Sequence, residues 1–432
     1  MKYCFSTLVL FGLGIVCAAA DGADQATDGP KLVPATRPEV KRALEALKSR
    51  EPRLPLPPPT DEERKAAGDR PLVNNGRMQA IYLPASWRVA KWGPDPAMTL
   101  DPALTIECFW VVSRGNNCHY CLGHQEHRLA GIGLSDNRIA SLDSDWSVFL
   151  PKEQAAFALA RKLTLAPHTV TNSDVDDLRK FFSDHEIVEL VFTIARFNST
   201  NRWTDSMGIP QDRQFREVQV RFDAPTSERF REAGSLAAPS SGQRRPPLES
   251  PSDVESALSA CRQRSARVTL PGPDEARSVL PTQWRDVPVP EWVCALSLFP
   301  ETGVAQVAAY DAVANEGKLD KLLKAQIAWT CARQDRAWYA LADAQRRLAQ
   351  LGQSADEMFS LDGPDETLSP AVREALAFAA KLTSAPHTIA DADIARLRKH
   401  YSDYETAEIV YVVCGSNWFD RFTETLGLKW FD

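Results

Sequence analysis

Helical periodicity dominates the hydrophobic pattern of the first half of the chain. Apolar residues recur at intervals of three and four, as they do along one face of an amphipathic helix. The segments with this pattern are 61–67, 102–114, 118–131, 151–164, 173–182 and 185–207. No run of alternating apolar and polar residues, which would indicate a half-buried strand, stands out. The pattern therefore predicts an all-α fold.

The second half of the chain repeats the first. Residues 160–208 match residues 379–427 at 21 of 49 positions without a gap, and Arg202 recurs as Arg421. Between them, residues 223–251 are rich in Ser, Pro, Arg and Gly, which is typical of a linker. The repeat predicts two tandem helical units, at 60–222 and 252–432. We expect the two units to pack as a pseudo-dimer and the recurring arginines to form structural ion pairs.

The first 59 residues lack the pattern of a globular unit. Residues 1–20 contain Lys2, an apolar stretch and a small-residue site ending at Ala20, which is typical of a cleaved signal peptide. This predicts an exported protein, periplasmic or secreted, with a lipid anchor at Cys17 as the rival interpretation. Residues 21–59 are proline-rich and charged, with one helix predicted near 38–48, and are expected to form an extended arm.

Composition narrows the classes of partner. The 432 residues carry a net charge of −7, with 44% hydrophobic and 25% charged residues. These values are typical of a soluble protein, and the negative charge argues against nucleic acid as the main partner. The apolar stretch near the N-terminus is too short for a stable membrane span. Five cysteines lie in apolar surroundings and are expected to be buried thiols: Cys108, Cys261, Cys294, Cys331 and Cys414.

Residues 113–127 contain the chemistry that stands out most. Cys118 and Cys121 are three apart, and His119, His124 and His127 lie among or after them. Gly115 suits the left-handed residue that closes the helix before them, and Asn116 or Asn117 suits the N-cap of the next helix. Cys118 would then lie in the first turn, where free backbone N–H groups favour a thiolate. Because Cys121 follows at i+3, the pair can form a disulfide, and a redox dithiol is the favoured interpretation.

Two other interpretations of the cysteine pair remain open. The first is an inert local disulfide, which is common in oxidising compartments. The second is zinc bound by Cys118, Cys121, His124 and His127, which are suitable ligand types. Steps of three along a helix drift by about 60° each, so four ligands would converge only if the helix unwound. We therefore predict no metal, and we predict no cofactor because covalent haem attachment would need a histidine where Leu122 stands.

The repeat offset shows what the second unit lacks. Ala337, Ala340, Asp343 and Gln326 stand at the positions of Cys118, Cys121, His124 and Glu107. The scaffold is retained while its thiols are lost. We infer that the cysteines are not needed for folding.

Several motifs resemble the carboxymuconolactone decarboxylase superfamily, specifically its alkylhydroperoxidase-D-like branch. The resemblance rests on residues 111–121 with the Cys-x-x-Cys motif, the Leu-Ala-Pro-His stretch at 165–168 and the Asn-Arg…Asp…Gly segment at 197–209. It implies bundles of about six helices per unit that assemble into oligomers. It also implies a thiol peroxidase or disulfide reductase in which Cys121 attacks, Cys118 resolves, and a glutamate and a histidine relay protons.

The relay positions depart from the family pattern. The family's relay glutamate would fall at Ile106, and Glu107 lies one residue after it. The family's relay histidine would fall at Gln125, and His124 lies one residue before it. A slip of one residue rotates a helical side chain by about 100°. His124 remains a neighbour of Cys121 at i+3. We expect Glu107 and His124 to form a relay that is rebuilt rather than inherited.

The sequence thus predicts a thiol-dependent peroxidase or disulfide oxidoreductase with Cys118, Cys121, His124 and Glu107 as its site. The substrate would be a small peroxide or disulfide, and a thioredoxin-like protein would supply electrons. A homo-oligomer built through the pseudo-dimer surface is a further expectation. One alternative is a decarboxylase or isomerase acting on a small lactone. Another is a non-catalytic structural or binding protein whose Cys-x-x-Cys is bridged or holds metal.

Overall fold

The part of the chain that the structure describes is built from helices. The computed structural model describes residues 33–68, 72–88, 95–211, 247–363 and 366–431. Within these ranges it contains nineteen α-helices with short 3₁₀ turns and no strand, so the all-α prediction is confirmed. None of the described helices has the length and apolar character needed to cross a bilayer.

The first half contains every helix that the periodicity predicts. Its helices are α1 (Arg37–Ala46), α2 (Asp61–Ala67), α3 (Asn75–Tyr82), α4 (Pro102–Gly115), α5 (His119–Gly131), α6 (Asp136–Ser144), α7 (Pro151–Leu165), α8 (Asn172–Arg179) and α9 (Asp184–Ser206). Local capping explains where they begin. Ser183, for example, accepts the amide N–H of Glu186, whose carboxylate bonds back to the amide of Ser183, and this capping box starts α9.

From residue 321 onward, the second half reproduces the order of the first half from residue 102 onward. Its helices are α11 (Pro251–Gln263), α12 (Pro273–Arg277), α13 (Glu291–Ser297), α14 (Thr302–Asn315), α15 (Lys321–Asp335), α16 (Trp338–Gln350), α17 (Ala355–Ser360), α18 (Pro370–Ser384), α19 (Asp391–Leu397) and α20 (Asp403–Thr425). The bounds of α16, α18 and α20 are those of α5, α7 and α9 shifted by 219 residues. The repeat in the sequence is therefore also a repeat of elements.

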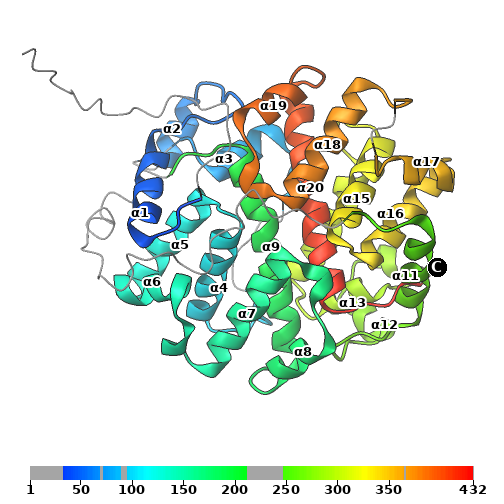
Figure 1. Cartoon of the computed structure of the whole chain (residues 1–432), viewed down its shortest axis with the longest axis horizontal. Helices are drawn as coiled ribbons and strands as arrows, with labels where there is room; N and C mark the ends of the chain where they lie inside the picture. The colour runs from blue at the N-terminus through cyan, green and yellow to red at the C-terminus, as the bar shows by residue number, and fades with distance from the viewer. Residues whose placement is uncertain (1–32, 69–71, 89–94, 212–246, 364–365, 432) are drawn as a thin grey trace, which may run out of the picture.

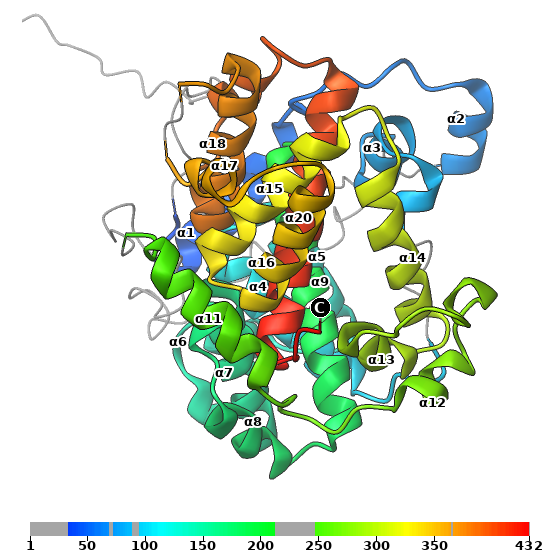
Figure 2. The same cartoon turned by 90° about the vertical axis from the view of Figure 1, so that its right-hand side faces the viewer.

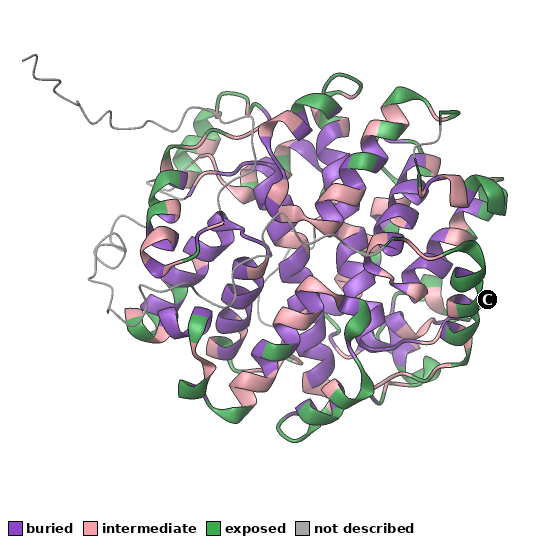
Figure 3. Ribbon diagram, in the orientation of Figure 1, coloured by how far each residue is buried: buried purple, intermediate pink, exposed green. Residues whose placement is uncertain are grey.

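Helices α9 and α20 lie side by side through the middle of the molecule, between the two halves (Figure 1). Both are almost fully buried along their length (Figure 3). From α9, the Arg202 guanidinium donates to the carbonyl oxygen of Thr383 at 3.2 Å. From α20, Arg421 donates to the carbonyl oxygen of Thr164, also at 3.2 Å. Each half thus donates a hydrogen bond to the other half through an arginine at the equivalent position.

Arg421 forms a buried ion pair with Asp335 at 2.5 Å, as expected. The hydrogen bonds of Arg202 include those to Asn198 and Thr383. At the position of Asp335, the first half has Asn116.

The turn between α4 and α5 differs from the prediction. Gly115 is the last residue of α4, and Asn117 takes the left-handed conformation with φ 54°. Arg336 does the same in the second half, with φ 53°. Cys118 is itself the N-cap of α5, so the helix begins at His119. Asparagine tolerates the left-handed region better than most residues, and this allows the turn to close without glycine.

Residues 33–59 pack on the bundle and do not form the extended arm that was expected. Helix α1 lies against α5, with Val40 and Leu44 in the core. Arg37 forms a buried ion pair with Glu126 of α5 and a second, at 2.7 Å, with Asp136. The sequence predicts an extended arm here because the partners of Arg37 lie about ninety residues away along the chain and no local pattern reveals them. The predicted signal peptide lies outside the described residues, as does most of the predicted linker.

Replacing Arg37 with methionine should destabilise the protein strongly. The Glu126 carboxylate would stay buried with the Trp110 indole N–H, at 3.1 Å, as its remaining described donor. Breaking a buried ion pair from one side costs about 3–5 kcal/mol of the free energy of unfolding. Urea unfolding of the full chain would measure the loss. Arg42→Met is the matched control, because the Arg42 side chain on the same helix is 71% exposed. Equal stabilities for the two variants would contradict the packing of α1.

Candidate functional site

Cys118 and Cys121 meet at the start of helix α5. The first amide groups of a helix have no partner within the helix and need an acceptor. Here the Cys118 sulfur supplies it, accepting the amide N–H of Cys121 at 3.4 Å. The sulfur that caps the helix is therefore held next to the residue that carries the second sulfur.

A single hydroxyl group contacts both sulfurs. Thr204 of α9 places its Oγ1 3.3 Å from the Sγ of Cys118 and 3.1 Å from the Sγ of Cys121. The same hydroxyl donates to the carbonyl oxygen of Thr200 at 3.0 Å, which fixes its position on the helix. Neither cysteine is bridged. The two thiols and the hydroxyl form a compact cluster between α5 and α9.

Burial governs the protonation of Cys121. The exposed fraction is 0% for Cys118 and 2% for Cys121. The pKa of the Cys121 thiol is raised well above its ordinary value, first by burial and then by the adjacent Cys118, while Thr204 and Asn201 act in the opposite direction. Cys121 therefore keeps its proton at neutral pH.

Asparagine side chains hold the turn that carries Cys118. The Asn116 side-chain amide donates to the Oδ1 atoms of Asn198 and Asn201, both at 3.0 Å. Asn201 in turn donates to the Ser113 hydroxyl at 3.2 Å. All four residues are buried. This network joins the end of α4 to α9 and so positions the dithiol against Thr204.

Glu107 and His124 make their described contacts away from the sulfurs. The Glu107 carboxylate lies 3.6 Å from the Arg138 guanidinium. The His124 Nδ1 donates to the carbonyl oxygen of Tyr120 at 2.9 Å, and its ring lies on the Tyr120 ring at 4.2 Å between centroids. The structure thus brings the two cysteines together, but it shows no contact of either relay candidate with them among the described interactions.

The remaining histidines near the dithiol have separate surroundings. The Nε2 of His119 lies 2.9 Å from the Asn117 side-chain oxygen, within the turn before the helix.

Within the described ranges there is no group of three or more His, Cys, Asp or Glu side chains placed to hold a metal ion. The five thiols expected to be buried are buried and unbridged.

Thr204 is the site residue that the sequence analysis missed. A signal was present, because Thr200 and Thr204 are one turn apart on a predicted helix within the segment that resembles the family. Thr204 also recurs as Thr423, which is buried and donates to the carbonyl oxygen of Phe419 at 2.8 Å. Because the threonine recurs in the half without thiols, the sequence indicates a structural role within the helix and gives no sign of a contact with sulfur.

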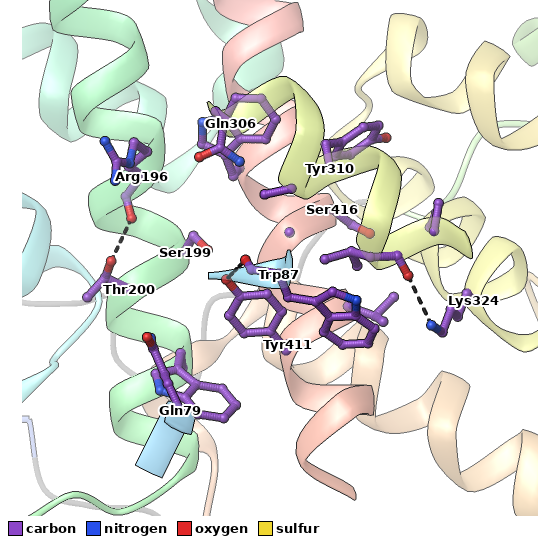
Figure 4. A pocket seen from close by; sticks show the side chains of 18 of the residues that line it. Gln79, Trp87, Arg196, Ser199, Thr200, Gln306, Tyr310, Lys324, Tyr411 and Ser416 are labelled. Carbon is purple, nitrogen blue, oxygen red and sulfur yellow. Dashed lines mark hydrogen bonds between the residues drawn. The ribbon is translucent and has the colours of Figure 1, made fainter. Parts of the chain in front are cut away.

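The described residues enclose two hollows, and one of them lies at the junction of the halves. The inner cavity, of about 100 Å³, lies between α9, α14 and α20 (Figure 4). Thr200 and Trp203 line it from α9, the helix that also carries Thr204, which contacts the dithiol. The outer cleft, of about 940 Å³, lies in the second half. Neither sulfur is among the residues that line these hollows.

Replacing Glu107 with glutamine should change how stability depends on pH. Burial, only partly offset by Arg138, raises the pKa of Glu107 from 4.5 to about 7. Because the folded protein then binds this proton more tightly than the unfolded chain, the free energy of unfolding falls as pH rises from 4.5 to 7. Glu107→Gln removes this fall, so at pH ~8 the variant should be more stable than wild type by about 3 kcal/mol.

Urea unfolding of both proteins across this range would measure the difference. The variant is expected to fold because the second half carries Gln326 at the same position. A difference between the two proteins that stays constant from acid to alkaline pH would contradict the raised pKa of Glu107.

Comparisons with known proteins give limited guidance. No family model matches the chain. The uncharacterized protein YdfG of Bacillus subtilis (strain 168) is 29% identical over 100 residues, which span 22% of this chain and 68% of that protein. The name of that relative states no activity.

Proposed function

We propose that the chain is a thiol-dependent oxidoreductase that cycles Cys118 and Cys121 between a dithiol and a disulfide. The observation that carries the proposal is the convergence of both sulfurs on the Thr204 hydroxyl at a helix start. Neighbouring thiols at i and i+3 need little movement to form a bond. The five other described thiols lie apart in the core and are not part of the proposal.

The order of attack in this proposal is the reverse of the family pattern. The Cys118 sulfur receives the amide N–H of Cys121 at the positive end of α5. Cys121 has a raised pKa because it is buried beside Cys118, and so it keeps its proton. We therefore assign the first attack to Cys118 and the resolving step to Cys121.

A small peroxide is the substrate that this order suits. The Cys118 thiolate attacks one peroxide oxygen, the O–O bond breaks, and the alcohol or water leaves with a proton. Cys118 is then a sulfenic acid. The Cys121 sulfur attacks it, the S–O bond breaks, water leaves with the thiol proton, and the disulfide forms. Thr204, within reach of both sulfurs, is placed to pass protons between them.

An external dithiol would return the disulfide to the reduced state. It supplies two electrons and two protons, and a thioredoxin-like protein in the exported compartment is the proposed donor. Both sulfurs are buried in the reduced state, so the residues that cover the start of α5 must move during turnover to admit the peroxide and the reductant. A relay by Glu107 and His124 is not part of this proposal because their described contacts lie with Arg138 and Tyr120.

The arrangement of the halves supports the accompanying proposal of a pseudo-dimer. Arg202 and Arg421 exchange equivalent hydrogen bonds across α9 and α20. Reciprocal contacts between equivalent residues are the signature of a two-fold interface. The second half would then supply, within one chain, the surface that relatives obtain from a second subunit.

Peroxide consumption with dithiothreitol as reductant tests the proposed function. Wild type and Cys331→Ala, a buried thiol of the second half, should consume hydrogen peroxide at similar rates. Cys118→Ser should lose this activity because it lacks the attacking sulfur. Cys121→Ser should retain one attack and accumulate a sulfenic acid on Cys118, which dimedone labelling and mass spectrometry would locate. Equal consumption by all four proteins would refute the redox proposal, and a sulfenic acid on Cys121 in Cys118→Ser would reverse the order of attack.

A further inference from the structure

The outer cleft is formed wholly by the second half. Helices α12 to α16 surround it together with the chain beyond α20, and its volume is about 940 Å³. Figure 2 shows α12 and α13 beside the C-terminal end of the chain. A hollow of this size is large enough for a small organic molecule.

Aromatic rings make the walls of the cleft. Trp292 packs edge-on against Tyr310 at 5.3 Å between centroids, and Tyr339 packs edge-on against Trp430 at 5.1 Å. The rim is apolar and open to solvent. Large exposed hydrophobic side chains on it are Val287, Leu351 and Phe431. An exposed apolar rim around aromatic walls favours a ligand with a flat apolar body.

The polar part of the lining is positively charged. Five cationic side chains line the cleft against two carboxylates. The Asp343 carboxylate is shared by two guanidinium groups, those of Arg346 at 2.7 Å and Arg347 at 2.6 Å. The Lys324 ammonium group donates to the backbone carbonyl oxygens of Val313 and Glu316. The second lining carboxylate, Asp311, also favours the charged form of Arg347. Two carboxylates cannot neutralise five cationic side chains, so positive charge remains for a ligand.

A buried hydroxyl in the cleft lacks a partner. The Tyr339 side chain is 1% exposed, and its hydroxyl has no hydrogen-bond partner among the described residues. Burial raises the pKa of this phenol well above its ordinary value, so the group is a neutral donor. A buried polar group without a partner costs free energy unless a ligand or water satisfies it. Tyr339 lies four residues before Asp343, on the same face of α16 as the charged cluster.

We propose that this cleft binds a small aromatic anion, such as an aromatic carboxylate or sulfonate. Its ring system lies between the Tyr310 and Trp430 walls. Its anionic group accepts a hydrogen bond from the Tyr339 hydroxyl and faces the Arg346 guanidinium, which is the more exposed of the two arginines. The remaining arginine keeps Asp343 paired when the ligand is bound.

This binding site is separate from the proposed thiol chemistry. Helix α16 is the counterpart of α5, and Tyr339, Asp343 and Arg346 correspond to Tyr120, His124 and His127. The half that lacks the thiols thus carries a charged cluster on the equivalent helix. The second half is, in this view, a ligand-binding unit as well as a packing surface.

Fluorescence titration of the full chain with two matched probes tests the site. Anilinonaphthalene sulfonate has an aromatic body and an anionic group, and N-phenylnaphthylamine has the same body without the charge. Wild type should bind the sulfonate saturably with a stoichiometry of one, and at least about tenfold more tightly than the neutral probe. Tyr339→Phe should weaken sulfonate binding by about tenfold, and Arg346→Gln by a similar factor, because each removes a bond to the anion. Neither should change the affinity for the neutral probe.

Two controls keep the test specific. Tyr120→Phe makes the same change at the equivalent position of α5 and should leave both affinities unchanged. Cys118→Ser should also leave them unchanged, so that failure of the redox proposal does not affect this one. Equal affinities of wild type for the two probes would overturn the proposal, as would equal losses in Tyr339→Phe and Tyr120→Phe.

Discussion

The reciprocal bonds of two buried arginines are the constraint on which the rest of the structure depends. A guanidinium group keeps its charge under all ordinary conditions, so a buried one must have acceptors. Arg202 and Arg421 find them partly on the opposite half, at Thr383 and Thr164. This sets α9 against α20. Because Thr204 follows Arg202 on α9 by two residues, the same constraint also sets the position of the hydroxyl that meets the dithiol.

The two halves carry different side chains on equivalent helices. In the first half, the start of α5 carries two thiols, and α1 covers the helix through the Arg37–Glu126 ion pair. In the second half, alanines replace the thiols, and α16 presents the Tyr339 hydroxyl and a cluster of charges to a cleft. Backbone geometry is retained, down to a left-handed residue at Asn117 and Arg336. The two halves differ in the side chains that this equivalent helix pair carries.

Local patterns in the sequence were sufficient for the helices, the buried thiols and the approach of Cys118 to Cys121. They failed where a partner is distant in the sequence. The helix predicted near 38–48 is present as α1, but it packs on the bundle and is not part of an extended arm, because its ion-pair partner on α5 lies 89 residues away in the sequence. The N-cap was assigned to an asparagine because a cysteine sulfur is an unusual acceptor, and Thr204 was missed because its contact depends on how α9 packs on α5. Relay roles for Glu107 and His124 remain predictions.

Redox titration of the full chain tests the central claim most directly. The protein would be equilibrated in glutathione buffers of graded potential, quenched in acid, alkylated after denaturation, and mapped by mass spectrometry. The account predicts one reversible disulfide, between Cys118 and Cys121, with the five other described cysteines alkylated at every potential. A pair of thiols that stays reduced under oxidising buffers, or a disulfide formed by other cysteines, would contradict it.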